Sequence, residues 1–157
     1  LNSLFTKSND LSEVKMKVQT RDFGAVDVNK EDFIKFNGRI FGFEDYNDYI
    51  LLYDDEFSGE YVWLQSAEEP DLCFIMANSA LIPDYKPDFE KEAEKVLGKG
   101  EYEYWLMMVV SENVKDSTVN LKSPVIINLS NNKAMQMIME DEYPIKYYLF
   151  NSGKEKK

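Results

Sequence analysis

The sequence predicts a mainly β fold, a single-domain antiparallel β-barrel-like or sandwich arrangement with one short helix at about residues 89–97. Roughly nine or ten short apolar segments recur along the chain, and turn signals separate them about every 8–12 residues, as in antiparallel barrels and sandwiches. Only one segment has the spacing of an amphipathic helix. With 157 residues and 44% hydrophobic content, the chain is long enough for one domain with a substantial core.

The segment Trp63–Tyr85 predicts the hairpin at the centre of this fold. Within it, Leu72–Ala77 is apolar at both alternating sets of positions, so a strand here would be covered on both faces. The preceding residues Glu68–Asp71 include Pro70 and resist burial, which predicts an acidic turn. We therefore expect Glu60–Gln65 and Leu72–Ala77 to pair as a central hairpin.

Further strands are expected on both sides of this hairpin. On its N-terminal side they are Lys17–Phe23, Ala25–Val28, Phe33–Phe36 and Tyr49–Tyr53. On its C-terminal side they are Tyr102–Ser111, Thr118–Leu121, Val125–Leu129, Ala134–Met139 and Tyr147–Phe150. Pro124 cannot donate to a β-ladder, so it predicts a bend and an interrupted, exposed edge. The stripe of Met135, Met137 and Met139 favours core packing, although methionine also suits adaptable binding surfaces.

The one predicted helix covers Phe89–Leu97. Its apolar residues fall at helical spacing on an otherwise charged segment: Phe89, Ala93, Val96 and Leu97. Asp88 is the expected N-cap and Gly98 the expected residue after the last turn. A helix of this length is marginal alone, so we expect its apolar stripe to dock on the sheet.

The domain is expected to span residues 16–150. Residues 1–15 have low apolar content and precede Met16, so they predict an N-terminal extension, either added or upstream of the natural start. A short helical arm opening at Asp10–Glu13 is the alternative interpretation. Residues 151–157 predict a polar tail.

Charge is the most informative bulk property. The whole chain carries −11, and residues 16–149 contain thirteen basic and 26 acidic side chains, a net charge of −13. A domain with this negative charge should not bind nucleic acid directly, because phosphate contacts need Lys and Arg. It should attract basic partners. The alternative, with about equal weight, is that acidity only confers solubility.

The residues for most catalytic chemistry are absent. The chain has no histidine, which removes the commonest general base and most zinc sites. Its single cysteine, Cys73, lies in an apolar strand where a thiol is inert, and a lone cysteine favours a reducing, cytoplasmic setting. The sequence contains no nucleotide-binding motif and no apolar run long enough to span a membrane, and we expect no signal peptide. We expect no enzyme activity, cofactor, metal or membrane contact.

Acidic clusters supply the alternative function. Three clusters could in principle supply a carboxylate pair for hydrolysis or a metal site: Asp54–Glu56, Glu68–Asp71 and Glu140–Glu142. Each lies in a turn between strands, where solvated carboxylates are ordinary. A carboxylate-dependent hydrolase or metal-binding acidic β-domain is therefore the less favoured alternative to a protein-binding module.

Four stretches together resemble one known family, the flagellar assembly factor FliW. They are Ile40–Glu44 with Tyr49–Leu52, Trp63–Ser66 through Glu69-Pro70 to Phe74 and Pro83–Tyr85, Thr118–Asn128, and Tyr143–Ile145. The resemblance covers about residues 16–150. Ser79 departs from it, since the family pattern has a proline there.

The resemblance implies a non-enzymatic, cytoplasmic β-barrel protein that is monomeric when free. Members of this family bind flagellin before its export and also bind CsrA, a small RNA-binding translational repressor. CsrA blocks translation of the flagellin message. The family protein antagonises CsrA, while cytoplasmic flagellin competes for it, so that flagellin synthesis is coupled to secretion.

Nine residues are candidates for partner binding. Gln65 and Asn120 are polar residues in strand-like segments, Pro124 marks the expected edge, and Tyr143 precedes a proline turn. A cap, a buried hydrogen bond or turn geometry explains each of them at least as well. The acidic turns supply the other candidates: Asp54, Asp55, Glu56, Glu68 and Glu69.

Overall fold

The computed structural model describes residues 4–5, 15–38, 40–57 and 59–150. The strands are β1 (Leu4–Phe5), β2 (Lys15–Thr20), β3 (Gly24–Asn29), β4 (Ile34–Phe36), β5 (Asp48–Asp54), β6 (Tyr61–Ser66), β7 (Cys73–Asn78), β8 (Tyr102–Val109), β9 (Thr118–Val119), β10 (Val125–Asn128), β11 (Lys133–Gln136) and β12 (Tyr147–Tyr148). The helices are α1 (Glu90–Leu97) and four 3-10 turns, η1 (Lys30–Asp32), η2 (Asp55–Phe57), η3 (Ser79–Leu81) and η4 (Val114–Asp116).

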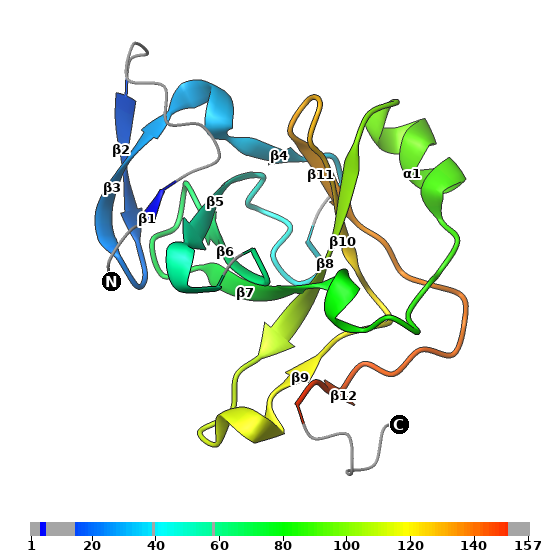
Figure 1. Ribbon diagram of the computed structural model, residues 1–157. Coiled ribbons are helices and arrows are strands. Elements are labelled where there is room, and N and C mark those ends of the chain that lie inside the picture. The colour runs from blue at the N-terminus through cyan, green and yellow to red at the C-terminus, as the bar shows by residue number, and fades with distance from the viewer. Residues whose placement is uncertain (1–3, 6–14, 39, 58, 151–157) are drawn as a thin grey trace.

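Seven strands close into a barrel (Figure 1). The order β4-β5-β6-β7-β8-β10-β11 returns to β4, because β10 pairs with both β8 and β11. Neighbours are antiparallel except β11 and β4, which are parallel. The expected mainly β fold is confirmed, and of the two architectures left open it is the barrel.

The barrel interior is a packed apolar core. Its buried residues include Tyr49, Leu64, Met76 and Trp105, each at most 1% exposed. Pleated strands send alternate side chains inward, so Leu64 and Met76 face inward while Trp63 and Ala77 face outward. The apolar character of Leu72–Ala77 on both faces is explained by this double burial.

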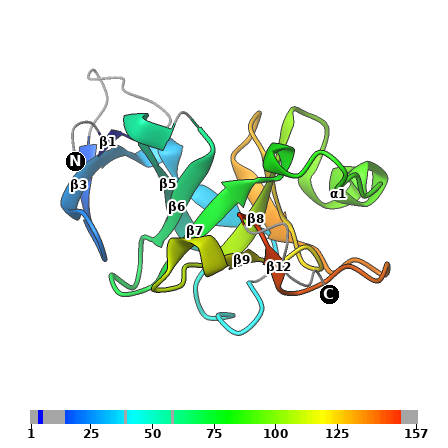
Figure 2. The same cartoon turned by 60° about the horizontal axis from the view of Figure 1, so that its bottom comes forward.

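Three segments cover parts of the outer surface. The β2–β3 hairpin packs on β5 and β6, where Val18 and Val28 contact Ile50 and Leu52. Helix α1 covers β10 and β11, and lies on the opposite side of the barrel from the hairpin (Figure 2). The C-terminal segment with η3 covers β7, β8 and β9. Each covering buries the outward apolar residues of the strands beneath it.

The helix differs from the prediction in detail. It begins at Glu90, and Phe89 rather than Asp88 occupies the N-cap position without a side-chain cap. Phe89 is buried against the barrel, so apolar packing of Phe89, rather than a polar cap, fixes the start of the helix. Gly98 caps the end at φ +80°, which only glycine adopts without strain. Val96 is 39% exposed, so the buried stripe is narrower than predicted.

Part of the expected N-terminal extension forms a strand. Residues Leu4 and Phe5 pair antiparallel with Asp54 and Tyr53 of β5. Lys15 already belongs to β2. Residues 1–3 and 6–14, and the polar tail 151–157, lie outside the described residues.

Candidate partner-binding surfaces

Gln65 organises the acidic turn after β6. It is fully buried, and its Oε1 accepts a 2.9 Å hydrogen bond from the Arg21 amide. Its Nε2 donates to the carbonyls of Ser66 (3.1 Å), Pro70 (3.1 Å) and Leu72 (3.2 Å). A buried amide with this many partners holds the turn in place, so Gln65 is not itself an exposed contact residue.

The carboxylates of this turn are also used internally. Glu68 accepts hydrogen bonds from the amides of Asn47 (2.9 Å) and Asp48 (3.2 Å), and Glu69 accepts one from Asp71 (3.1 Å). The hydroxyl of Ser66 accepts from the Glu68 and Glu69 amides. Glu68 remains solvent-exposed and Glu69 is half-buried. The turn therefore presents its charge in a fixed conformation.

Asp54 to Glu56 form a second acidic loop, which leads from β5 to β6 and lies at the other end of β6 from the acidic turn. Asp54 is only 3% exposed and accepts from the Glu56 amide at 3.0 Å, whereas Asp55 and Glu56 are exposed. The register places Ser66 beside Tyr49 and Val62 beside Tyr53, so the two acidic loops lie at opposite ends of the β5–β6 ladder. They do not converge, and the described residues contain no group of three or more His, Cys, Asp or Glu that could hold a metal ion.

The remaining candidates lie near the C-terminal covering. Asn120 Oδ1 accepts from the amides of Lys122 (2.9 Å) and Ser123 (3.0 Å), which shapes a turn. Pro124 is buried and its carbonyl accepts from Met137 at 3.0 Å, so the expectation of an exposed edge at Pro124 is wrong. The β10 backbone is paired on both sides, and the bend at Pro124 lies inside the fold.

Three of the four stretches that carry the family resemblance meet at Tyr143. Its ring packs edge-to-face on Tyr85, with centroids 5.0 Å apart. The Tyr85 hydroxyl donates to the Leu121 carbonyl at 2.8 Å, and the Leu121 amide donates to the Pro144 carbonyl at 3.0 Å. These residues attach the C-terminal segment to the barrel. The contacts among them give a structural role to the three stretches of the sequence in which they occur.

Asn128 organises the end of α1, although it was not among the residues predicted from the sequence to be functional. It is fully buried, and its Nδ2 donates to the carbonyls of Leu97 (2.9 Å), Gly98 (3.2 Å) and Lys99 (3.3 Å) at the end of α1. A Cβ added at Gly100 would lie 2.3 Å from Asn128 Oδ1, so glycine is needed there. The only sequence signal was a polar residue at the end of an apolar strand.

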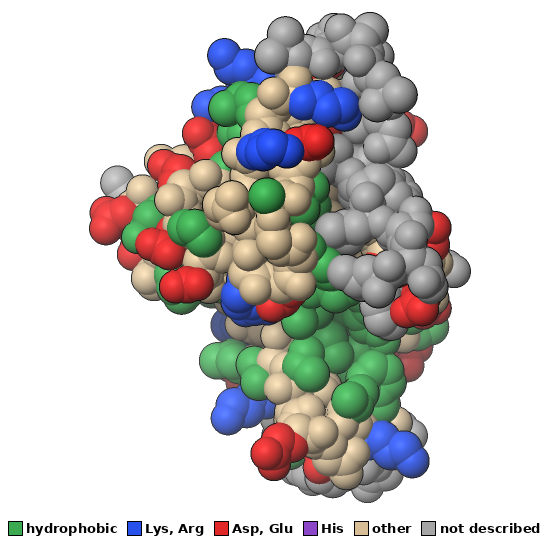
Figure 3. Space-filling model, turned by 90° about the vertical axis from the view of Figure 1, so that its left-hand side faces the viewer, with side chains coloured by type: hydrophobic (Ala, Val, Ile, Leu, Met, Phe, Trp, Pro, Cys, Tyr) green, Lys and Arg blue, Asp and Glu red, His purple; other side chains and the backbone are tan. Residues whose placement is uncertain are grey.

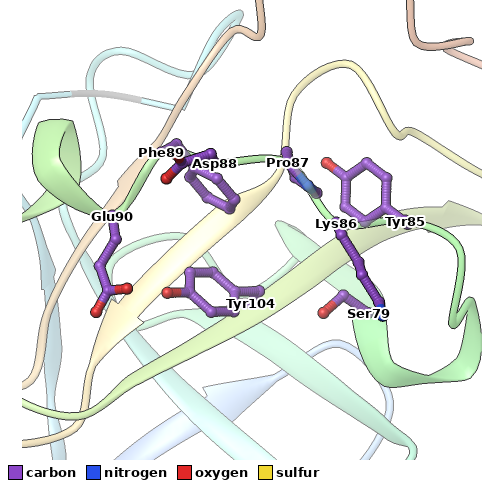
Figure 4. A pocket seen from close by; sticks show the side chains of 8 residues that line it. All are labelled: Ser79, Tyr85, Lys86, Pro87, Asp88, Phe89, Glu90 and Tyr104. Carbon is purple, nitrogen blue, oxygen red and sulfur yellow. The ribbon is translucent and has the colours of Figure 1, made fainter.

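Two hollows flank Phe89, where the chain enters α1. The first has a volume of about 280 Å³, and its lining mixes charges, since it includes Lys86 as well as Asp88 and Glu90. Figure 4 shows the rings of Phe89 and Tyr104 in its wall; their centroids are 4.9 Å apart. Burial and the nearby Glu90 raise the pKa of Tyr104.

The second hollow, here named the α1 groove, is acidic. It has a volume of about 290 Å³ and lies between the start of α1 and the chain after β11. Its lining combines four carboxylates with an apolar floor: Asp88, Phe89, Glu92, Met137, Ile138, Met139, Glu140 and Asp141. The methionine stripe and Glu140–Glu142 are separate features of the sequence, and nothing in the sequence showed that they share a groove with α1.

An apolar surface lies on another face. The register of β6, β7 and β8 puts Trp63, Ile75 and Met108 in one row across the outside of the barrel, and all three are half-buried. Figure 3 shows hydrophobic side chains gathered in the lower half of this side of the molecule, below the β2–β3 hairpin. Partly exposed apolar surfaces of this kind are a feature of protein-binding faces.

Cys73 is not a reactive group. The residue is buried, and desolvation raises the pKa of its thiol to about 12, so the thiol is protonated at neutral pH. None of the helices in the described ranges has the length and apolar character needed to cross a membrane.

Comparisons with known proteins agree on one family. The family model described as "FliW protein" matches residues 17–149. A flagellar assembly factor FliW from Caldicellulosiruptor saccharolyticus is 36% identical over 143 residues, covering 88% of this chain and 93% of that protein. A second, from Caldanaerobacter subterraneus subsp. tengcongensis, is 34% identical and covers 84% and 91%.

A solved structure shares the fold. The crystal structure of a flagellar assembly factor FliW superposes with a TM-score of 0.74 at 24% identity, covering 86% of this chain and 97% of that chain. The family match spans all seven barrel strands, α1 and the three converging stretches around Tyr143. On these grounds, the chain belongs to the FliW family of flagellar assembly factors.

Proposed function

We propose that this protein binds flagellin and the RNA-binding repressor CsrA, and thereby couples flagellin synthesis to secretion. The family match over residues 17–149 carries the proposal. The charge of −13 on residues 16–149 supports it, because a repressor that holds RNA presents a basic surface. In this role the protein acts in the cytoplasm, is monomeric when free, and makes no direct contact with nucleic acid.

Electrostatics supplies a mechanism for the antagonism. An acidic protein docked beside an RNA-binding surface lowers the affinity of that surface for phosphate even where it does not cover it. The effect acts over roughly 8 Å at physiological ionic strength, so it is stronger at low salt. Asp55, Glu56 and Glu68 are exposed, so their charges contribute to the electrostatic field on this surface.

The choice between partners requires only that the two complexes exclude each other. Flagellin accumulating in the cytoplasm would then withdraw the protein from CsrA by mass action. The released repressor would bind the flagellin message, and synthesis would stop until export removes flagellin.

The test measures displacement of a labelled RNA from purified CsrA by this protein. The variant removes charge from the acidic turns without removing internal hydrogen bonds. Asp54 is left unchanged because it is buried and accepts a hydrogen bond from the Glu56 amide. Glu68 and Glu69 are changed to Gln, whose side-chain oxygen can still accept the backbone hydrogen bonds. The variant Asp55→Asn/Glu56→Gln/Glu68→Gln/Glu69→Gln should antagonise RNA binding less, with a flatter salt dependence. Undiminished antagonism rejects the charge mechanism and leaves steric or conformational coupling.

The partners themselves are tested by a pull-down from a motile bacterial lysate, followed by titration with purified proteins. Recovery of flagellin and a small basic dimer is expected. Recovery of neither, together with no binding of purified flagellin or CsrA, contradicts the proposal.

A further inference from the structure

We propose that the α1 groove is a docking site for a basic, extended segment of a protein partner, with one Lys or Arg side chain inserted between α1 and residues 137–141. The inference rests on the proposed function in one respect: the basic partner is taken to be the RNA-binding repressor. It adds a location and a binding mode, which neither the family match nor the total charge provides.

The lining of the groove fits a long cationic side chain. Phe89 and Met139 are buried and Met137 is half-buried, so the floor is apolar. The rim carries Asp88, Glu92, Glu140 and Asp141, all exposed, and no Lys or Arg lines it. A Lys or Arg lays its aliphatic stem on apolar surface and keeps its head group polar, and methionine adapts to the shape of such a stem.

The rim carboxylates have no cationic partner within the described part of the chain. The three salt bridges found among the described residues lie elsewhere, at Lys17–Asp27, Arg21–Asp22 and Lys35–Asp48. Lys122 lies close to the rim, but its Nζ donates to the Asp141 backbone carbonyl at 2.7 Å and not to a carboxylate. This contrasts with Glu68 and Glu69, whose carboxylates are already hydrogen-bonded.

A metal ion is the less suitable occupant. The described residues contain no group of three or more carboxylates, cysteines or histidines close enough to hold one. Carboxylates spread around an apolar floor suit a cationic group on a hydrocarbon stem better than a bare ion, which needs six or so converging oxygens.

The backbone beside the groove favours an extended partner. The amides of Met137 and Met139 donate to the carbonyls of Pro124 and Lys122, so their hydrogen-bonding groups point towards residues 122–124. Backbone groups alternate in direction along an extended chain, and those of Ile138 and Glu140 make no hydrogen bond within the described residues. Ile138 is 55% exposed. This open edge can pair with an incoming strand, which would add backbone hydrogen bonds to the contact made in the groove.

The first experiment separates groove charge from total charge. Binding of purified CsrA is measured by fluorescence anisotropy for wild type, for Glu92→Gln/Glu140→Gln, and for the matched control Glu94→Gln/Glu112→Gln, which removes two exposed charges outside the groove. The groove variant should bind about tenfold more weakly, because it loses charges that contact the partner directly. The control should change affinity less than about threefold. Equal losses in both variants, or no loss in the groove variant, overturn the inference.

The second experiment tests the open edge. Ile138→Pro removes an amide that has no internal acceptor, so the fold should tolerate it, whereas Ile138→Ala keeps the amide. Weaker binding by the proline variant alone supports strand addition. Equal binding by both variants overturns it, provided that circular dichroism shows both are folded.

A third measurement keeps the groove and the proposed function distinguishable. A labelled peptide of sequence Val-Arg-Val-Lys-Val is titrated into the full chain, and amide shifts are followed by NMR. Shifts confined to residues 137–141 and the start of α1 support the groove even if CsrA does not bind, an outcome that would reject the proposed function alone. Binding of CsrA by wild type and groove variant alike, without such shifts, rejects the groove alone. Failure of both probes rejects both.

Discussion

The acidic turn after β6 and the α1 groove look alike in the sequence and differ in the structure. The turn contains Glu68–Asp71 and one side of the groove contains the similar run Glu140–Glu142, each between apolar segments, while Asp88 and Glu92 form the other side of the groove. In the turn, buried Gln65 holds three carbonyls, and Glu68 accepts two backbone hydrogen bonds. In the groove, the carboxylates of Glu92 and Glu140 have no salt-bridge or hydrogen-bond partner within the described residues.

The difference separates two uses of negative charge. A carboxylate that accepts backbone hydrogen bonds stabilises the loop around it, and its removal is felt as lost stability. A carboxylate without such contacts contributes little to folding and remains available to a partner. Total charge therefore overstates how much of the acidic surface is specialised for binding.

The largest expected effect comes from Gln65. The change Gln65→Leu leaves the Arg21 amide and the carbonyls of Ser66 and Pro70 without their buried partner, while the Leu72 carbonyl keeps the hydrogen bond from the Ser66 amide. Each unsatisfied buried group costs about 1–3 kcal/mol, part of which water entering the turn recovers, so the free energy of unfolding should fall by about 3 kcal/mol. Urea denaturation followed by tryptophan fluorescence measures it.

The control for Gln65 is Glu92→Gln in the groove. It should change the free energy of unfolding by less than about 0.5 kcal/mol, as expected for an exposed side chain without partners. Similar losses for the two variants would show that the turn and the groove do not differ in the way described.

Asn128 should have the next largest effect, because it joins α1 to the barrel. The change Asn128→Ala removes the donor that holds the carbonyls of Leu97, Gly98 and Lys99. We expect a loss of about 2 kcal/mol in unfolding free energy and faster hydrogen exchange in residues 90–97. Partner binding through the α1 groove should weaken as well, since the groove needs α1 in place.

A matched control for Asn128 is Asn131→Ala, which removes the hydrogen bond that Asn131 donates to the Leu97 carbonyl at 2.9 Å and the one it accepts from the Lys133 amide at 3.0 Å. It should have a smaller effect, because Asn131 is exposed. Hydrogen exchange in α1 that is unchanged by Asn128→Ala would show that packing of Phe89, Ala93 and Leu97 alone fixes the helix.

The sequence was sufficient for the fold class, for most strands and for the helix, because these follow from apolar periodicity. It could not distinguish a barrel from a sandwich, since closure depends on the parallel pairing of β11 with β4, residues about a hundred positions apart. It also assigned Gln65 and Pro124 to a partner surface, although the structure buries both. Whether a polar side chain bonds internally depends on distant backbone groups, such as the Arg21 amide, that local pattern does not reveal.

The acidic turn and the groove can be compared directly through single carboxylates. Glu68→Gln weakens two charge-assisted hydrogen bonds to the Asn47 and Asp48 amides, so unfolding free energy should fall by about 1 kcal/mol. Glu140→Gln should leave it unchanged within about 0.3 kcal/mol and should instead weaken partner binding. Thermal unfolding and anisotropy on the same two preparations measure both properties. A loss of stability in Glu140→Gln together with a loss of binding alone in Glu68→Gln would contradict the assignment of the turn to stability and the groove to binding.

The smallest effect is expected at Asp27, which is exposed like the groove carboxylates but has a partner. Lys17 on the neighbouring strand donates to Asp27 at 2.7 Å, and this hydrogen bond and charge lower the pKa of Asp27 below 3.8. Because the pKa is lower in the folded protein, the pair stabilises the hairpin above pH 3.8, and this stabilisation is lost as the pH falls through the folded pKa. NMR titration of the Asp27 carboxyl should show a midpoint below 3.8 that rises in 1 M salt or in Lys17→Met. If the Asp27 titration midpoint changes neither in salt nor in Lys17→Met, an exposed cation does not measurably stabilise a carboxylate on this surface. Partner binding by the α1 groove would then have to come from its apolar floor rather than from its charge.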